Sequence, residues 1–245
     1  MKKIFYSITI FLFFFIIASI VYLATLGIET NRFNNLISNK IKYNIDEKLT
    51  VDLNKIKIKL DIQNLSFFIF TQNPKFFYHN TSIQLRELRA YINIEKILKK
   101  NNTPDRVFVS SEPMKIQDLK KILIFTKPSN FKSFALNNIE SGELKISLDL
   151  DFDENFNLED YQFDGYVKKI KGDYKKNIIF EDLDFIFVIN KNLGSLREIK
   201  GSINEISINS GSLDYKSLKN LEVNMNFESK LNLKNEELNQ LLDKL

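Results

Sequence analysis

The N-terminal stretch of the chain is strongly apolar. From Ile4 to Leu26 no residue is charged. At about 1.5 Å rise per residue, a helix of this length exceeds the ~20 residues needed to cross a ~30 Å hydrocarbon core. A cleavable signal peptide has a shorter apolar region, roughly 7–15 residues, followed by small residues. Here Ala18 and Ala24 stand among bulky neighbours. We therefore predict a retained transmembrane signal anchor over residues 4–26, preceded by a cytoplasmic tail of residues 1–3.

The orientation of this span does not follow from counting charges alone. Lys2 and Lys3 precede the span, whereas Arg32, Lys40 and Lys42 follow it. A very short positive tail before a first span usually stays in the cytoplasm. We therefore expect the bulk of the chain to lie outside the cytoplasm.

Directly after the span, apolar residues recur at three- and four-residue spacing. They are Phe33, Leu36, Ile37, Ile41 and Ile45. This spacing predicts an amphipathic helix over residues 30–48. Two roles fit it equally well. Its apolar face can lie on the bilayer surface, or it can close the end of the sheet that follows.

From residue 50 onward the hydrophobic period changes from 3.6 to 2, the period of strands with one apolar face. The alternation slips once, at Asn54–Lys55, which predicts a bulge or a strand break. The alternating apolar sets are Val51, Leu53, Ile56, Ile58, Leu60 and Ile62; Leu88, Ala90, Ile92 and Ile94; Leu144, Ile146, Leu148, Leu150 and Phe152; Leu183, Phe185, Phe187 and Ile189; and Leu221, Val223, Met225, Phe227, Leu231 and Leu233. Ile186 and Val188 make the fourth set apolar on both faces. The other sets predict strands that are wet on one face.

Glycines stand between these runs, where turns are expected because glycine adopts positive φ at little cost. They are Gly142, Gly165, Gly172, Gly194, Gly201 and Gly211. Two short helices are predicted, one over Ile116–Leu123 and one at the C-terminus around Leu238–Leu245. Long helices do not alternate regularly with strands, so a parallel βαβ architecture is excluded. The pattern predicts a mainly β domain over residues 50–245, built on a mostly antiparallel sheet with a few short helices.

Composition narrows the function classes. The net charge is +4, from 35 basic and 31 acidic residues that are interspersed, and a nucleic-acid binder would carry a basic stripe or tail. The chain has no cysteine, which excludes disulfides, thiolate nucleophiles and zinc–cysteine sites. The single histidine, His79, lies between two apolar runs, and we predict that it is a hairpin-loop residue. No phosphate-binding or nucleophile-elbow motif occurs. We therefore predict no enzyme, no cofactor and no metal site.

One acidic cluster offers an alternative to that prediction. Asp149, Asp151 and Asp153 fall on one face of a strand, opposite the apolar set that ends at Phe152. Calcium binding is the functional interpretation, but the glycine-bearing loop of a calcium site is missing. We interpret these residues as the solvated side of a half-buried strand.

The amount of apolar strand surface remains to be explained. A sheet with one apolar face must bury it against a second layer, and the predicted helices are few and short. Either the sheet folds over on itself, or its concave face holds something apolar.

The order of these features resembles the N-terminal portion of the AsmA-like proteins of Gram-negative bacteria, including the YhdP and TamB branches. The span ends in YLATLGIET, the stretch RFNNLISNKI follows, and the strands VDLNKIKIKL, NLSFFIF and RELRAYINIEKIL precede repeated strands that glycines punctuate. The resemblance covers nearly the whole chain as a pattern. Members are commonly much longer, so we expect a short trough belonging to a fragment, a short paralogue or one part of an assembly.

The resemblance implies an inner-membrane anchor and a periplasmic, curved sheet that forms an open, taco-like groove lined with apolar side chains. It also implies that membrane phospholipid is the partner, carried between the inner and outer membranes. The candidate groove positions are Leu144, Ile146, Leu148, Leu150, Phe152, Leu183, Phe185, Phe187, Ile189, Leu221, Val223, Met225, Phe227, Leu231 and Leu233. The alternative is a scaffold for outer-membrane protein biogenesis that offers a strand edge to a protein partner.

Overall fold

The computed structural model describes residues 2–31, 34, 38, 49–79, 81–99, 103–174, 177–204, 206–217 and 221–229. Among them, the helices are α1 (Lys2–Thr25), α3 (Ile94–Leu98), α4 (Ile116–Leu123) and α5 (Asn130–Asn138). The strands are β1 (Ile28–Thr30), β2 (Leu49–Asp52), β3 (Ile56–Asp61), β4 (Ser66–Gln72), β5 (Lys75–Tyr78), β6 (Thr81–Asn93), β7 (Arg106–Ser111), β8 (Met114–Lys115), β9 (Ile139–Phe152), β10 (Leu158–Tyr174), β11 (Ile178–Asn190), β12 (Leu193–Ile203), β13 (Ile206–Ser217) and β14 (Leu221–Ser229).

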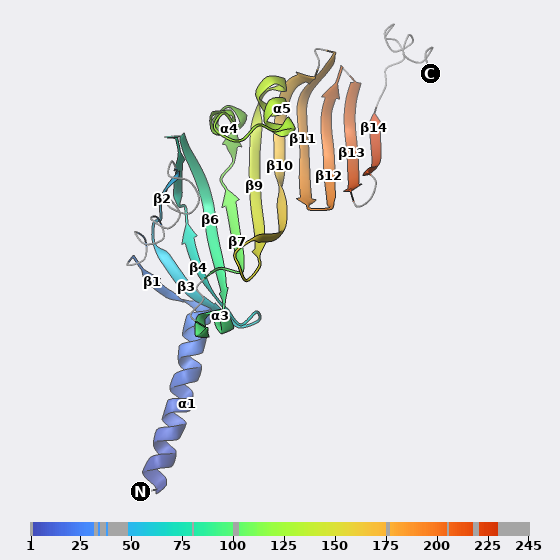
Figure 1. Ribbon diagram of the computed structural model, residues 1–245. Helices are drawn as coiled ribbons and strands as arrows, with labels where there is room; N and C mark the ends of the chain where they lie inside the picture. Colours follow the sequence, from blue (N-terminus) through green and yellow to red (C-terminus); the bar gives the residue numbers. More distant parts are fainter. Residues whose placement is uncertain are drawn as a thin grey trace. The chain divides into compact units, whose positions relative to one another are not determined.

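The strands of this part of the chain pair antiparallel in the order β1-β3-β4-β6-β7-β9-β10-β11-β12-β13-β14 (Figure 1). The strands β2, β5 and β8 pair at the side of this path. The sheet is open, because its two end strands β1 and β14 do not pair with each other. The prediction of a mainly β chain with a curved, open, antiparallel sheet and few short helices is confirmed.

The chain divides into two compact units. Unit 1 comprises residues 1–112 and 147–161, and unit 2 comprises residues 113–146 and 162–245. The strands β9 and β10 each contribute residues to both units.

The helix α1 begins unit 1 and is long and apolar enough to cross a membrane, with a mean hydropathy of 2.6 over Ile4–Thr25. Its hydroxyl side chains donate hydrogen bonds to backbone carbonyls four residues earlier, Thr9 to Phe5 and Ser19 to Phe15. Their polar hydrogens are therefore satisfied within the helix, as a hydrocarbon environment requires. The helix ends at Thr25, and Gly27, with a φ of +72°, joins it to β1.

One face of the unit 1 sheet is apolar. Paired residues of an antiparallel sheet share a face, and one row of such pairs runs through Ile58, Ile69, Ala90, Val107 and Leu150. The side pair β2–β5 covers part of this face, where Val51, Leu53, Ile56, Ile69 and Phe76 pack together.

The opposite face of unit 1 carries an ion pair in which Arg106 donates from Nε to a carboxylate oxygen of Asp149 at 2.6 Å. Nearby, burial and the charge of Asp149 raise the pKa of Asp151 above its ordinary value. Asp153 lies outside the strand, in the turn after β9, where its Oδ1 accepts hydrogen bonds from the backbone amides of Asn155 and Asn157. The placement of Asp153 on the solvated side of the strand was therefore wrong, because its carboxylate is needed to close the turn.

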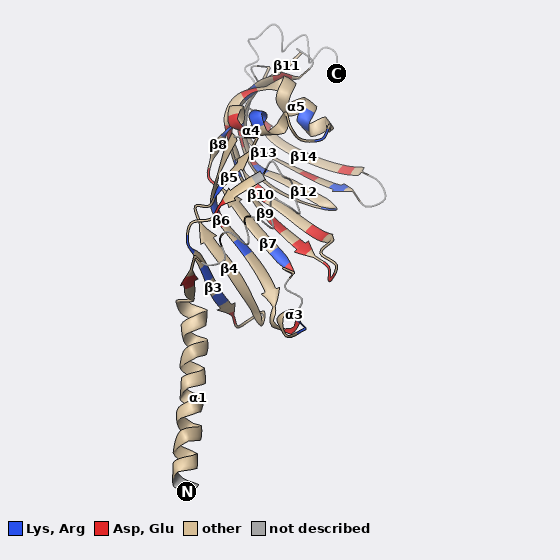
Figure 2. Cartoon of the chain, turned by 60° about the vertical axis from the view of Figure 1, so that its left-hand side comes forward, with Lys and Arg blue, Asp and Glu red and all other residues tan. Residues whose placement is uncertain are grey.

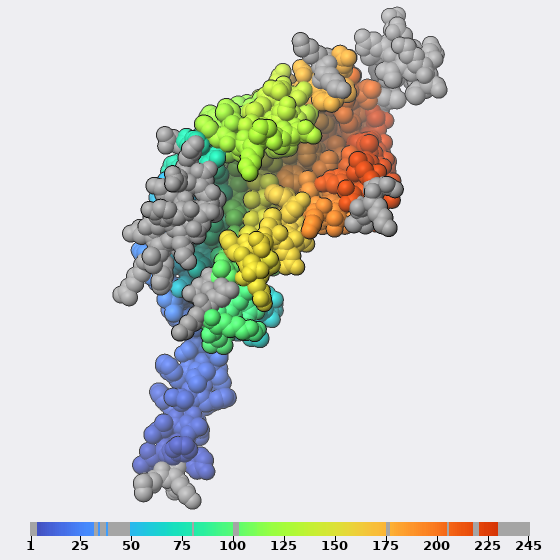
Figure 3. Space-filling model, in the orientation of Figure 1, coloured from blue at the N-terminus to red at the C-terminus, as the bar shows by residue number. Residues whose placement is uncertain are grey.

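Unit 2 is a sheet with a helical pair at one end of one face. α4 and α5 stand over the strands β9 to β11 (Figure 1). In the space-filling view, α4 and α5 are yellow-green, the later strands are orange, and the surface between them is hollowed (Figure 3). The core of unit 2 lies between α4 and the strands and contains Ile116, Val167, Ile170, Phe180 and Phe187.

The prediction that the six glycines lie in turns was wrong, because all six lie inside strands. Gly142 and Gly201 do have the expected positive φ, +141° and +138°, although they lie within strands. At Gly165 the role is close approach. A Cβ atom at Gly165 would come within 2.0 Å of the backbone oxygen of Lys145 and 2.9 Å of the Phe187 ring. The missing side chain lets β9 and an aromatic ring lie against β10 at this point.

The break at Asn54–Lys55 separates β2 from β3, and α4 spans the residues predicted for it. His79 lies in the β5–β6 turn with a φ of +46°. The predicted helix over residues 30–48, with its apolar positions Phe33, Leu36, Ile37, Ile41 and Ile45, lies outside the described residues apart from 30, 31, 34 and 38. The predicted C-terminal helix also lies outside them.

Candidate functional site

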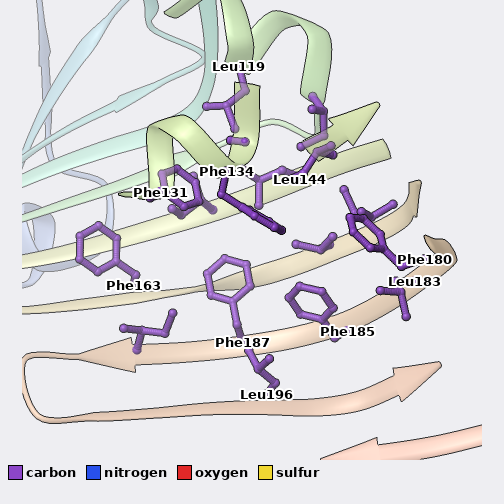
Figure 4. Close-up of a pocket in the computed structure, with 17 residues that line it drawn as sticks. Leu119, Phe131, Phe134, Leu144, Phe163, Phe180, Leu183, Phe185, Phe187 and Leu196 are labelled. Carbon is purple, nitrogen blue, oxygen red and sulfur yellow. The ribbon is translucent and has the colours of Figure 1, made fainter. Parts of the chain in front are cut away.

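The most prominent feature of unit 2 is an apolar cavity of about 530 Å³ that opens to the surface. Its walls come from two helices and four strands (Figure 4). The lining residues are Ile116, Leu119, Phe131, Phe134, Ala135, Ile139, Leu144, Ile146, Phe163, Val167, Ile170, Phe180, Leu183, Phe185, Phe187, Ile189 and Leu196. Each of these side chains is apolar. A volume of this size falls within the range of roughly 300–1,000 Å³ that small-molecule sites have.

The floor of the cavity is formed by rows of paired residues on β10, β11 and β12. Phe187 pairs with Gly165 on one side and with Leu196 on the other, so all three share a face. The neighbouring row joins Phe163 to Ile189. The Phe187 ring lies over Gly165, which has no side chain to exclude it.

A bulge in β10 adds two further residues to the floor. The register shifts between Val167 and Ile170, and Lys169 has a φ of +51°. The carboxylate of Asp184 accepts a hydrogen bond from the Lys169 amide at 2.7 Å and so holds the bulge. Because the bulge inserts a residue, Val167 and Ile170 both face the cavity despite their odd spacing.

The helices α4 and α5 form one wall and the roof. Ile116 and Leu119, one turn apart on α4, line the cavity. Phe131 and Phe134 do so from α5 (Figure 4). The Phe134 ring stacks on the Phe180 ring with centroids 6.4 Å apart. Ala135 is fully buried, so α5 approaches the sheet closely.

Two contacts fix the roof. Ser129 caps α5 by accepting a hydrogen bond from the Lys132 amide at 3.1 Å. The ammonium of Lys120 on α4 donates to the carbonyl of Leu136 on α5 at 3.0 Å. The roof is therefore a braced helical pair rather than a loop.

The apolar face continues past the cavity to the open edge of unit 2. Leu196 pairs with Leu213, and Leu213 pairs with Met225 on β14. Met225 is 62% exposed, and its strand neighbours Val223 and Phe227 are also exposed. In the described part of the chain β14 pairs with β13 only, so the floor of the groove runs on to an open strand.

The predicted groove positions fall into four groups. Leu144, Ile146, Leu183, Phe185, Phe187 and Ile189 line the cavity. Leu221, Val223, Met225 and Phe227 lie on β14, where the apolar face continues outside the cavity. Leu148, Leu150 and Phe152 belong to unit 1. Leu231 and Leu233 lie outside the described residues.

Several lining residues were not predicted from the sequence. Phe163 and Leu196 lie in strands whose alternation is short, and Val167 and Ile170 are out of phase because of the bulge. The α5 residues Phe131, Phe134 and Ala135 keep helical spacing, the one signal that could have found them. We find no titratable side chain in the lining, so the cavity offers contact surface rather than acid–base chemistry.

A second, polar depression lies in unit 1 around Lys96 and Lys99. Its charges are already paired internally, since Lys96 contacts Asp105 and Lys99 contacts Glu95. Glu154 and Glu159 add further negative charge. It therefore makes a weaker candidate than the apolar cavity.

No protein-family model matches the chain, and no curated protein and no solved structure matches it either. The resemblance to AsmA-like proteins therefore stays a prediction that rests on the order of features in the sequence.

Proposed function

We propose that this protein is a membrane-tethered lipid-binding module whose unit 2 cavity holds an acyl chain. The observation that carries the proposal is an open cavity of about 530 Å³ in which every lining side chain is apolar. A space of this kind attracts hydrocarbon because water gains nothing from filling it. The helix α1 supplies the tether, as a single span of the inner membrane with the sheet in the periplasm.

The energetics favour transfer over storage. Each methylene removed from water contributes about 0.8 kcal/mol, so ten methylenes would contribute about 8 kcal/mol. A lipid in a bilayer has already left water, however, and its move into the cavity changes this term little. The exchange is then close to balanced in either direction, which suits a module that contributes to phospholipid transport between the inner and outer membranes.

The lining also predicts the selectivity of the module. With hydrocarbon on every wall, the site can recognise chain length and shape but offers no partner to a polar headgroup. The headgroup would remain in water at the open side of the cavity. We therefore expect several phospholipid classes with similar acyl chains to bind comparably.

Photocrosslinking tests this function. The full-length chain in nanodiscs is exposed to a phospholipid with a diazirine in its acyl chain, and the adducts are mapped by mass spectrometry. Binding in the cavity places adducts on the strands around Phe163, Phe185 and Leu196 as well as on α1. Adducts confined to residues 4–25 would refute the proposal, because the lipid would then contact only the anchor.

One observation favours a second candidate, the scaffold that offers a strand edge. Among the described strands β14 pairs with β13 alone, and the backbone groups of its other edge could pair with an added strand. Under this alternative, a photoreactive residue introduced on β14, at Asn224 or Asn226, would crosslink to a protein, and phospholipid adducts in the cavity would be absent.

A further inference from the structure

The α4–α5 hairpin exposes apolar side chains at its tip. Ile124 is 58% exposed and Phe125 is 45% exposed where the chain leaves α4, and Phe131 is 59% exposed on the first turn of α5. Exposed large apolar residues gathered on one projecting element are typical of a surface that meets a membrane or a partner.

The same hairpin is basic. Residues 116–138 contain Lys120, Lys121, Lys127 and Lys132 and a single acidic residue, Asp118. Blue lysine segments are visible on α4 and α5 in the charge-coloured view (Figure 2). Lys121 pairs with Asp118 at 2.7 Å, and the four lysines against this one carboxylate leave the hairpin an excess of three positive charges. Lysines that flank exposed aromatic and aliphatic residues complement an anionic lipid surface, where the ammonium groups meet phosphate and the apolar groups insert between headgroups.

The tip is held in shape by one of these lysines. The ammonium of Lys132 donates hydrogen bonds to the carbonyls of Ile124 and Thr126, each at 2.7 Å. The exposed apolar residues are therefore presented by a fixed turn. Insertion into a headgroup layer would not require the hairpin to be ordered first.

The hairpin is also a wall of the cavity. Phe131 and Phe134 of α5 both line the cavity and are 59% and 37% exposed, so they lie at its open margin. They connect the basic, apolar tip to the cavity interior without a polar barrier. An acyl chain that leaves a bilayer at the tip would meet hydrocarbon from the first methylene onward.

We propose that the α4–α5 hairpin docks unit 2 on anionic phospholipid membrane and that Phe131 and Phe134 form the entrance through which an acyl chain reaches the cavity. The docking stands on the hairpin alone, whereas the entrance rests on the proposed lipid-binding function. Lipid is favoured over an acidic protein because the lysines lie beside large exposed apolar side chains that can insert between headgroups. The helix α1 is also long enough to keep the chain at a membrane.

The absence of cysteine in the native sequence permits a direct test. Full-length Asn130→Cys, on α5, is labelled with an environment-sensitive dye and reconstituted in phosphatidylcholine vesicles. Asn192→Cys, in the β11–β12 turn, is the matched label position. In one arm, separate vesicles that contain phosphatidylglycerol and a lipid-borne quencher are then added. In the other arm, phosphatidylglycerol and the quencher are placed in the bilayer that holds the protein. We expect quenching at residue 130 but not at residue 192, and more than tenfold weaker quenching when phosphatidylglycerol is omitted.

Charge variants separate electrostatic docking from a general effect of net charge. The double variant Lys121→Glu with Lys127→Glu should raise the vesicle concentration needed for half-maximal quenching at least tenfold. Each lysine near an anionic surface contributes about fivefold to the affinity for it. Lys191→Glu with Lys216→Glu changes the net charge equally at other exposed positions of unit 2 and should leave docking unchanged. Ile124→Ser with Phe125→Ser should abolish quenching at residue 130 while circular dichroism stays native.

Each outcome decides a specific point. An unquenched label at residue 130 in folded protein overturns the docking. The docking is also overturned if quenching is the same without phosphatidylglycerol and in the double lysine variant. Pull-down of an acidic protein without lipid quenching would assign the hairpin to a protein partner instead. Cavity adducts from the diazirine lipid together with an unquenched label would support lipid binding and refute the docking. Quenching without cavity adducts would support the docking and refute lipid binding in the cavity.

Discussion

Placing a carboxylate in the cavity floor gives the sharpest test of lipid binding. Leu196 on β12 lines the cavity and pairs with Phe187 and Leu213. The preceding residue, Ser195, points to the opposite face of the same strand, where it pairs with Val188 and with Asp214, whose carboxylate contacts Arg197. Leu196→Asp and Ser195→Asp therefore introduce the same charge one residue apart, inside and outside the groove.

The expected magnitudes follow from burial. Fully burying a leucine contributes about 2 kcal/mol, and because Leu196 is only partly buried, its loss should cost the empty protein about 1 kcal/mol. In the loaded protein an acyl chain would have to dehydrate the carboxylate, which costs several kcal/mol per ion. A penalty of about 3 kcal/mol corresponds to roughly a hundredfold weaker binding.

The assay is the yield of acyl-diazirine adducts on unit 2 in nanodiscs, with urea unfolding as the control for stability. Leu196→Asp should lose cavity adducts at neutral pH and regain part of them in acid, because dehydration by the lipid raises the pKa of the new carboxyl. Ser195→Asp should label like the native chain. Equal labelling of the two variants, both folded, would refute the reasoning, since the acyl chain would then lie elsewhere.

Three further predictions concern stability, each measured as a free energy of unfolding in urea. Asp151→Asn should stabilise the protein at neutral pH, because burial and the charge of Asp149 raise the folded-state pKa of Asp151. The gain in stability should decrease as the pH drops through that pKa and vanish below the pKa of the unfolded chain. A gain that persists in strong acid would contradict this cause. Gly165→Ala should cost about 3 kcal/mol or more, because the new Cβ meets the backbone oxygen of Lys145, and a neutral effect would mean that the strands do not approach so closely. Ser129→Ala should cost about 1 kcal/mol through loss of the α5 cap, whereas Ser129→Asp, which can still cap the helix, should cost less.

Local patterns in the sequence predicted much of the secondary structure. The uncharged stretch from Ile4 predicted α1, the slip at Asn54–Lys55 separated two strands, and the alternation from Leu183 to Ile189 identified β11 with its apolar residues. These features depend on residues adjacent in the chain, so composition and period suffice to find them.

The glycines show where a local signal has two meanings. Glycine favours turns, but it also permits close approach of a neighbouring strand or ring. At Gly165 the second meaning holds, and it depends on Lys145 and Phe187, which are distant in sequence. No period in the local sequence distinguishes the two cases.

For this protein, the sequence by itself determined that a membrane-length helix precedes antiparallel strands, and which residues alternate on each strand, because a strand's two faces are a property of backbone geometry. The tertiary structure alone decided which of those apolar faces were covered. The row from Phe187 through Leu196 and Leu213 to Met225 exists only once four strands pair in register. The roof over its cavity end comes from α4 and α5, and α5 depends on a serine cap and on the contact of Phe134 with Phe180. Whether apolar surface becomes packed core or an open cavity depends on how far such distant elements reach across it.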